Sequence, residues 1–151
     1  MKTYKVKLIN NLLDFDIDNL LKESKEEGFR MIERLINDYK DGSNTFNNSG
    51  ECLFGVFNEE DMLVAIGGLN RDPFSGVPYV GRLRRFYVSK EYRRKGIGSL
   101  LVTRIVEEAN KYYQVLVLHT ETEAAHQFYC TVGFSRGSLY ENSSHYMKLK
   151  S

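Results

Sequence analysis

Polar and apolar residues alternate or cluster in several short segments, and each of these segments predicts a β-strand. Strict alternation over Tyr4–Leu8 is typical of a half-buried strand, whereas Val115–Leu118 is continuously apolar, as expected of a strand covered on both faces. The turn-forming segment Asn58–Asp61 joins two of the strands as a hairpin. The predicted strands are residues 4–8, 52–57, 62–69, 80–88, 115–118, a short segment from Phe134, and 145–149.

Apolar residues recur at helical spacing in the remaining segments. Residues 14–40 carry them at intervals of three and four, and Gly28 divides this stretch into two helices. Residues 97–109 predict a helix that keeps its apolar side chains on one side. Residues 123–131 predict a short helix, with Gly133 as its left-handed C-terminal cap.

The order of these elements, β-α-α-β-β-β-α-β-α-β-β, predicts an α/β layer structure with a mixed sheet. With 151 residues and no candidate linker, we expect a single domain over residues 1–151. Two loops are rich in polar and turn-forming residues: 43–50, which we expect to be mobile, and 72–78.

The composition argues against several classes of function. The formal net charge is +1, so no overall field draws the chain to nucleic acid or to an acidic membrane. No apolar run is long enough to cross a bilayer, and no apolar segment of the signal-peptide type follows Met1. Cys52 and Cys130 lie far apart without a CxxC pattern, which is typical of reduced thiols. We therefore expect a cytoplasmic protein.

The most informative segment is Arg93–Ser99, where a strand ends and a helix begins. Gly96 and Gly98 follow a basic triplet in this segment. The first amides of a helix are unpaired and carry partial positive charge, and glycine lets the backbone approach a ligand closely. The segment therefore predicts a phosphate-binding turn. It is not a P-loop, since no GKS or GKT is present, and Leu101 replaces the third glycine of a dinucleotide fingerprint.

A second motif follows one helix and one buried strand later. The pattern RxxGxG at Arg93–Gly98 is followed by AxxFYxxxGF at Ala125–Phe134. Together the two motifs resemble the cofactor loop and the C-terminal helix of the GCN5-related N-acetyltransferase (GNAT) family. The resemblance implies a mixed, mostly antiparallel sheet that is flanked by helices and splayed between its fourth and fifth strands. It also implies transfer of an acetyl group from acetyl-CoA to a primary amine of a small molecule or peptide, by direct attack in a ternary complex.

The resemblance assigns the pyrophosphate of coenzyme A to the turn and the pantetheine arm to the preceding strand. The amides of Arg94–Ser99 would receive the pyrophosphate, and main-chain groups of Phe86 and Val88 would bind the pantetheine like an added strand. Tyr129 would protonate the departing thiolate. The residues expected to contact the cofactor are Phe86, Tyr87, Val88, Arg93, Arg94, Lys95, Gly96, Ile97, Gly98, Ser99, Thr122 and Phe128.

The residues that face the acceptor are less defined. Many family members carry a glutamate on the fourth strand where this chain has Arg82, so that base is missing here. Glu121, His119 or a backbone carbonyl acting through water could replace it. We expect Arg82 or Arg84 to receive a carboxylate of the acceptor, and Glu121 to be a further candidate for contact with it. The alternative is that these arginines pair with carboxylates of the chain itself.

Other groups of potentially reactive side chains give weaker evidence of function. His126 and Cys130 lie four residues apart on one helix and could form a thiolate–imidazolium pair for a ping-pong route. No third group is evident to orient them, which favours a half-buried thiol. The acidic and histidine residues over 119–126 show no recurring ligand spacing, so we expect no metal. A non-catalytic acyl-CoA-binding regulatory domain is the alternative function, and edge strands near the C-terminus would allow a homodimer.

Overall fold

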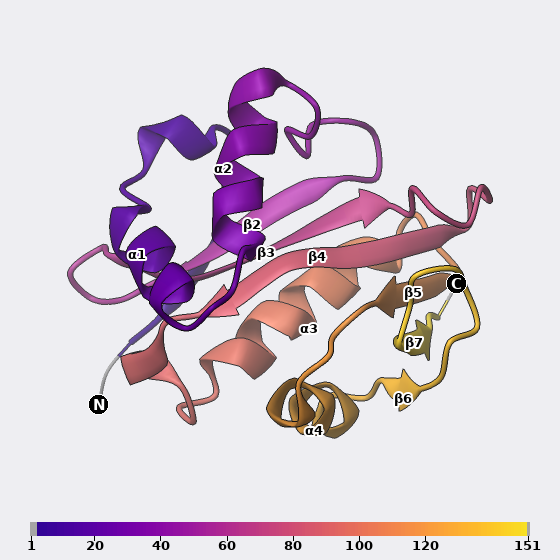
Figure 1. Cartoon of the computed structure of the whole chain (residues 1–151). Helices are drawn as coiled ribbons and strands as arrows, with labels where there is room; N and C mark the ends of the chain where they lie inside the picture. Colours follow the sequence, from indigo (N-terminus) through magenta and orange to yellow (C-terminus); the bar gives the residue numbers. More distant parts are fainter. Residues whose placement is uncertain (1–2, 151) are drawn as a thin grey trace.

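The structure, a computed structural model, describes residues 3–150, which form a seven-stranded sheet with helices on both faces (Figure 1). The strands lie in the order β1-β2-β3-β4-β5-β7-β6. Among the described strands β4 and β5 are parallel, and every other neighbouring pair is antiparallel. The strands are β1 Lys5–Leu8, β2 Cys52–Phe57, β3 Leu63–Arg71, β4 Val80–Val88, β5 Val115–Leu118, β6 Ser135–Arg136 and β7 His145–Lys148. The helices are α1 Asp18–Glu26, α2 Met31–Asp41, α3 Ile97–Ala109 and α4 Glu123–Thr131, with short 3₁₀ turns at Leu12–Asp14 and Lys90–Tyr92.

Alternation along the strands gives the sheet two apolar faces, and different helices cover them. Leu53 and Ile66 belong to the face on which α1 and α2 bury Leu20, Ile32 and Leu35. The helix α3 lies along the opposite face (Figure 1). Its buried side chains are the five that the helical spacing placed on one side: Ile97, Leu101, Val102, Ile105 and Ala109. The predicted mixed α/β sheet, flanked by helices, is thus confirmed.

The second half of β4 separates from β5. The two strands pair over Val80–Arg82 and Val115–Val117, and β5 then continues beside β7. A bulge sets Arg85 and Phe86 of β4 opposite the single residue Gly67 of β3, with Arg85 at a φ of 57°. A bulge bends a strand and increases its twist, which turns the end of β4 away from its neighbour. The predicted splay between the fourth and fifth strands is confirmed.

The loop before β2 is anchored, although we expected a mobile segment. Phe46, which is 3% exposed, packs over Gly68, where any side chain would collide with its ring. The side-chain amides of Asn44 and Asn70 exchange hydrogen bonds of 2.9 and 3.0 Å. A single aromatic residue in an otherwise polar stretch therefore holds the loop against the sheet, where α2 also packs.

Other local expectations can be compared directly with the structure. Gly28, between α1 and α2, and Gly133, after α4, adopt the left-handed conformation with φ of 84° and 110°. Cys52 and Cys130 are both free thiols. Among the helices of residues 3–150, none combines the length and the apolar character needed to cross a membrane.

Candidate active site

A cleft of about 1250 Å³ opens where β4 and β5 diverge. It is lined by the turn before α3, the second half of β4, the residues after β5, the first turns of α4 and the start of α2. Every residue that we expected to contact the cofactor or the acceptor lines this cleft, except Lys95 and Ile97. The Lys95 ammonium lies 5.5 Å from the centre of the Tyr92 ring. Ile97 is only 1% exposed, so its contribution to a ligand is limited to its backbone amide.

The turn before α3 presents an uncapped helix N-terminus to the cleft. Gly96 has a φ of 79° and Arg94 a φ of 60°. Successive residues of left- and right-handed conformation turn their amides into one concavity that attracts anions. Within residues 3–150 no side chain caps α3, and its first turn carries no acidic residue. The amides of this turn are therefore available to an anion, which the helix dipole further attracts.

Arg93 is held by the protein rather than presented to a phosphate. Its Nη1 and Nη2 donate to the Glu27 carboxylate at 2.9 and 2.6 Å, and its Nε donates to the Val88 carbonyl at 3.0 Å. The hydrogen bonds from Arg93 lower the pKa of Glu27, although burial of that carboxylate acts in the opposite direction. Arg93 thus joins the end of α1 to the end of β4. Arg93 lines the cleft, but its guanidinium is engaged by Glu27 and Val88, so its contact with the cofactor stays a prediction.

The Arg93 side chain also occupies part of the free edge of β4. Ser89 donates its amide to the Val64 carbonyl at 2.8 Å. In an antiparallel ladder the adjacent residue directs both main-chain groups to the other side, so those of Val88 point toward the gap. The Val88 carbonyl accepts the bond from Arg93. The Val88 amide is therefore the group left for a ligand in the gap, whereas we had expected both of its main-chain groups to be free.

Gly98 allows α3 and α4 to approach each other beside the phosphate-binding turn. A Cβ atom at this position would lie 2.9 Å from Cζ and 3.0 Å from Cε1 of Phe128. The Phe128 ring in turn packs against Phe86 of β4, with ring centroids 5.8 Å apart. The missing side chain at position 98 therefore sets where the aromatic wall of the cleft lies.

Gly98→Ala is expected to weaken coenzyme A binding about 10-fold, because the new methyl group must displace the Phe128 ring into the cleft. Overpacking of this kind typically costs about 1–3 kcal/mol. Calorimetric titration with coenzyme A measures the effect. Leu100→Ala is the matched control, since Leu100 lies in the same turn but is 42% exposed and outside the cleft. Unchanged affinity in Gly98→Ala would contradict the assignment of this wall to the cofactor.

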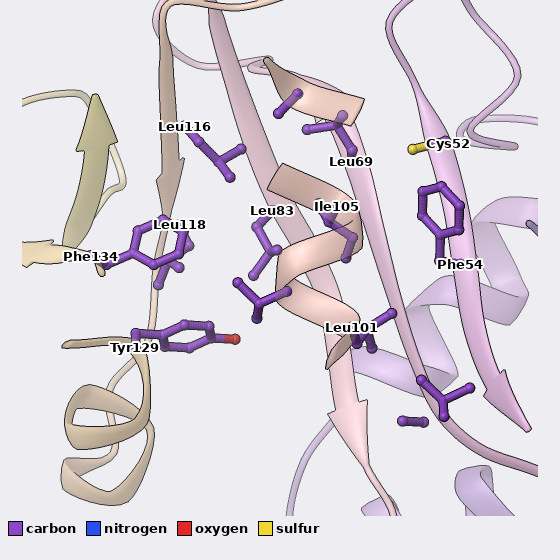
Figure 2. Packing of buried hydrophobic residues seen from close by; sticks show 14 of the residues in the cluster. Cys52, Phe54, Leu69, Leu83, Leu101, Ile105, Leu116, Leu118, Tyr129 and Phe134 are labelled. Carbon is purple, nitrogen blue, oxygen red and sulfur yellow. The ribbon is translucent and has the colours of Figure 1, made fainter. Parts of the chain in front are cut away.

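Tyr129 is buried, and its side chain points from α4 across the gap between β5 and β4 (Figure 2). Its ring packs against those of Phe86, Phe128 and Phe134, with centroids 5.9, 5.1 and 5.7 Å away. Burial raises the pKa of Tyr129, and no hydrogen bond from residues 3–150 contributes to the shift. The phenol therefore stays protonated at neutral pH. It can donate a hydrogen bond or a proton to a group in the cleft.

Thr122 serves as the N-cap of α4. Its Oγ1 accepts a hydrogen bond of 3.2 Å from the Ala125 amide. Thr122 lines the cleft, as expected, but its oxygen is engaged in holding the helix that carries Tyr129. Its hydroxyl proton is the part that remains for a ligand or a water.

Arg82 does not present its guanidinium to an acceptor. The residue is 3% exposed, and its Nε donates to Asp72 Oδ1 at 2.7 Å. Its Nη1 and Nη2 donate to the carbonyls of Asn142 and Glu141 at 2.7 and 2.9 Å, and the Phe74 ring centre lies 4.8 Å from its Cζ. A buried cation needs partners of this kind. The expectation that Arg82 binds a substrate carboxylate is therefore corrected, because a carboxylate of the chain itself fills that role.

Arg84 lies two residues further along β4 and lines the cleft without such partners. Within residues 3–150 it forms no ion pair, whereas the adjacent Arg85 pairs with Asp38 at 3.3 Å. Burial, together with the charges of Arg85 and Arg82, lowers the pKa of Arg84 to about 10. The guanidinium still carries its charge at neutral pH. It is thus a half-buried cation, facing the cleft, for which the described residues supply no anion.

His119 and Glu121 follow β5 and line another part of the cleft. The His119 Nε2 atom lies 3.4 Å from Glu121 Oε1. The side chains are 49% and 85% exposed, so both are solvated. An imidazole and a carboxylate are both chemical groups that serve as general bases, so both residues remain candidates for that role.

The start of α2 adds residues that the sequence analysis did not name. Phe29, Arg30, Met31 and Arg34 line the same cleft as Arg84. The helical spacing of this segment indicates a sheet-covering helix, and only the resemblance to the family implies that the region also walls the acceptor site. The signal that could have identified these residues is the pair of arginines shortly after Gly28, the predicted boundary between two helices. They make this part of the cleft basic as well as apolar.

Comparisons with known proteins agree with this geometry. Residues 50–136, more than half of the chain, match the family model of the acetyltransferase (GNAT) domain. A protein of Exiguobacterium sp. 255-15, whose crystal structure is assigned to an acetyltransferase, is 32% identical and has a TM-score of 0.86, with 97% of this chain and 93% of that chain covered. A Staphylococcus aureus Mu50 acetyltransferase of the GNAT family is 21% identical with a TM-score of 0.74, covering 98% of this chain and 100% of its own. A GNAT N-acetyltransferase from Escherichia coli, crystallised in complex with CoA, is 13% identical with a TM-score of 0.73, with 99% of this chain and 83% of that chain covered.

The agreement extends from the motifs to the fold. The family match includes the phosphate-binding turn, the splayed strands and the helix that carries Tyr129. The relative that is 32% identical covers nearly the whole chain, so the elements outside the matched segment are shared as well. The protein therefore belongs to the GNAT family of acetyltransferases.

Proposed function

We propose that residues 1–151 act as a single acetyl-CoA-dependent N-acetyltransferase domain that acetylates a primary amine by direct attack in a ternary complex. The observation that carries this proposal is a single cleft that joins the uncapped N-terminus of α3 to the Tyr129 side chain through the gap between β4 and β5. The amides of Arg94–Ser99 receive the pyrophosphate of coenzyme A, and the pantetheine arm lies in the gap. The CoA complex of the Escherichia coli relative, which has the same fold, supports this assignment.

Acetyl transfer requires the movement of two protons, and the cleft offers a group for each. The leaving thiolate resembles that of cysteine, with a pKa of about 8.5, so the protonated Tyr129 phenol can donate to it. The incoming amine must lose a proton before or during the attack. Glu121 and His119 are the titratable groups at the end of β5 that can accept this proton, directly or through water. No covalent acyl-enzyme is needed, since both substrates occupy the same cleft.

The acceptor that fits this cleft carries a carboxylate near its amine, as an amino acid does. Arg84 is a half-buried cation without an anion from the described residues, and Arg30 and Arg34 add positive charge to the cleft wall. Hydrogen bonds to charged groups contribute about 1.5–3 kcal/mol each. A polyamine would instead bring further positive charge to these arginines, which disfavours it.

A thiol-release assay with acetyl-CoA and a panel of amines tests the proposed function. We expect free coenzyme A to appear only when an acceptor amine is present, and mass spectrometry to find the acetyl group on that amine. A regulatory binding domain would give a thermal shift with coenzyme A and no acceptor-dependent thiol with any amine. That outcome would contradict the enzymatic function as a whole.

Arg84→Gln is expected to lower kcat/KM for a carboxylate-bearing acceptor about 10- to 100-fold, because the lost charge-assisted hydrogen bonds contribute about 1.5–3 kcal/mol. The decarboxylated form of the same amine should change less than about threefold, since it makes no such bond. The KM for acetyl-CoA should also be unchanged. Arg71→Gln, at an exposed position outside the cleft, controls for the loss of one positive charge. Equal effects on both amines would contradict the proposed acceptor class while leaving the acetyltransferase function intact.

A further inference from the structure

Three potential metal ligands from α4 and β7 meet outside the cleft. His126 and Cys130 lie one turn apart on α4, and His145 is the first residue of β7. The His126 Nδ1 atom lies 2.9 Å from His145 Nε2 and 3.6 Å from Cys130 Sγ. All three ligand atoms lie within 4.8 Å of one another. The third group that the sequence did not reveal for His126 and Cys130 is His145, which lies 19 residues from His126 in the chain.

The spacing of these atoms suits a tetrahedral zinc ion. With Zn–N distances of about 2.0–2.1 Å and a Zn–S distance of about 2.3 Å, tetrahedral angles place two nitrogens about 3.3 Å apart and a nitrogen and a sulfur about 3.6 Å apart. The two separations from His126 Nδ1, 2.9 Å to His145 Nε2 and 3.6 Å to Cys130 Sγ, differ from these values by a few tenths of an ångström at most, and the third pair of atoms lies within 4.8 Å. To admit the ion, the two imidazole rings and the exposed Cys130 side chain must rotate toward a common centre.

The surroundings of His145 favour a lone pair on the nitrogen that faces the cluster. Its Nδ1 atom lies 2.7 Å from Ser144 Oγ, which also accepts the Thr120 amide at 2.9 Å. Ser144 Oγ has a second lone pair that can accept the Nδ1 proton, and in that tautomer Nε2 is the unprotonated nitrogen.

His126 and Cys130 complete the donor set. The Nδ1 atom of His126 faces His145, and its outward Nε2 lies 3.5 Å from Arg136 Nη1. Arg136 is exposed, so it can turn toward solvent when the outward nitrogen carries the proton. Cys130, which we expected to be half-buried, is also exposed, so its sulfur is accessible to an ion from solvent. Two imidazoles and a thiolate are ligands of the borderline-soft type that zinc prefers.

We propose that His126, Cys130 and His145 bind a zinc ion, with water as the fourth ligand. The ion would fasten α4, the helix that carries Tyr129, to β7 of the sheet. We expected no metal from the residues over 119–126, which lie on a strand end, a loop and a helix. Of those residues only His126 belongs to the proposed site, and the other two ligands are Cys130 and His145.

A catalytic thiol is the other chemistry that these residues suggest, with His126 as base and His145 orienting it. The cleft argues against it. None of His126, Cys130 and His145 is among the residues that line the cleft, although His145 lies behind Tyr129 with ring centroids 6.2 Å apart. A thiol outside the cleft cannot reach the acetyl group of a bound cofactor. The cluster therefore fits a metal site better than a ping-pong nucleophile.

Cobalt substitution tests the zinc site without reference to acetyl transfer. The reduced, tag-free full chain is titrated with Co²⁺ alone and then with Zn²⁺. We expect a thiolate-to-cobalt charge-transfer band, together with visible d–d bands of tetrahedral intensity, at one equivalent, and their loss when zinc displaces cobalt. With free zinc about 100-fold above its dissociation constant, the Tm should rise by about 5–10 °C. Absence of the charge-transfer band would overturn the proposal.

Variants locate the metal. Cys130→Ser should abolish the charge-transfer band and weaken zinc binding more than about 100-fold, which exceeds the usual effect of removing a partner of a ligand. Cys130 is exposed, so this variant is expected to fold, and His126→Ala should weaken zinc binding in the same way. The third histidine of the chain provides the control, since His119→Ala should bind cobalt and zinc as the wild type does. Wild-type cobalt spectra in Cys130→Ser would place the metal elsewhere and overturn the assignment.

Discussion

Tyr129→Phe is expected to lower kcat for acetyl transfer about 100- to 1,000-fold and to leave the KM for acetyl-CoA within about threefold of the wild type. The substitution removes one oxygen and keeps the ring that packs against Phe86, Phe128 and Phe134. Within residues 3–150, no hydrogen bond contributes to the raised pKa of the Tyr129 phenol. Its removal should therefore leave the folded state intact. The loss falls on the step in which the thiolate departs.

Thiol release at saturating acetyl-CoA measures kcat, and calorimetry measures cofactor affinity. Tyr113→Phe is the matched control, because Tyr113 is also buried, but its hydroxyl donates to the Gly50 carbonyl at 2.6 Å outside the cleft. We expect this control to lose some stability and to keep its kcat. If Tyr129→Phe lowered cofactor affinity as much as kcat, the residue would be a packing element rather than an acid.

The pH dependence of kcat follows from the same burial. An acid is effective while it holds its proton, and the raised pKa of Tyr129 extends the protonated form above the ordinary tyrosine value of about 10. Ionisation of Tyr129 should therefore cause no fall in kcat below about pH 10. A fall near pH 8–9 that disappears in Tyr129→Phe would contradict the raised pKa.

The parts of the site that could be predicted from the sequence are local in the chain. The phosphate-binding turn depends on Gly96 and Gly98, which lie within one turn of each other, and the amides follow from the start of a helix. The buried face of α3 follows from its spacing, because a helix repeats every 3.6 residues. Tyr129 could be placed because its motif spans only one short helix and the residues directly after it, although its burial could not be foreseen.

The errors concern side chains whose partners are distant in the sequence. Arg93 meets Glu27, 66 residues away, so its charge is not left for a phosphate. Arg82 binds the carbonyls of Glu141 and Asn142, which follow it by 59 and 60 residues. A basic residue on a strand has the same local pattern whether it faces a substrate or an internal carboxylate. Only the tertiary structure distinguishes the two.

Asp72→Asn is expected to lower the free energy of unfolding by about 3–5 kcal/mol, the usual cost of breaking a buried ion pair from one side. The side chains of Asp72 and Arg82 are 0% and 4% exposed, so the Arg82 charge would remain buried without its counter-ion. Arg82 also holds two carbonyls of the segment before β7, and that segment should loosen as well. Urea denaturation measures the loss. Lys111→Gln, at an exposed pair with Glu108, is the control and should change stability by less than about 1 kcal/mol.

The pH dependence of stability separates the lost ion pair from lost packing. Burial alone would raise the pKa of Asp72, but the hydrogen bonds from Arg82 and Ser75 outweigh it and lower the pKa below its ordinary value. The pair therefore stabilises the fold fully above the unfolded pKa of about 4, and this contribution disappears as the pH falls through the lower, folded value. Asp72→Asn should accordingly lose less stability than the wild type between about pH 5 and pH 3.

Because a double replacement of both partners by apolar residues leaves no buried charge, Asp72→Leu combined with Arg82→Met should recover much of the stability. A double variant no more stable than Asp72→Asn would mean that Arg82 stabilises the fold mainly through the carbonyls it binds, and not through its pairing with Asp72.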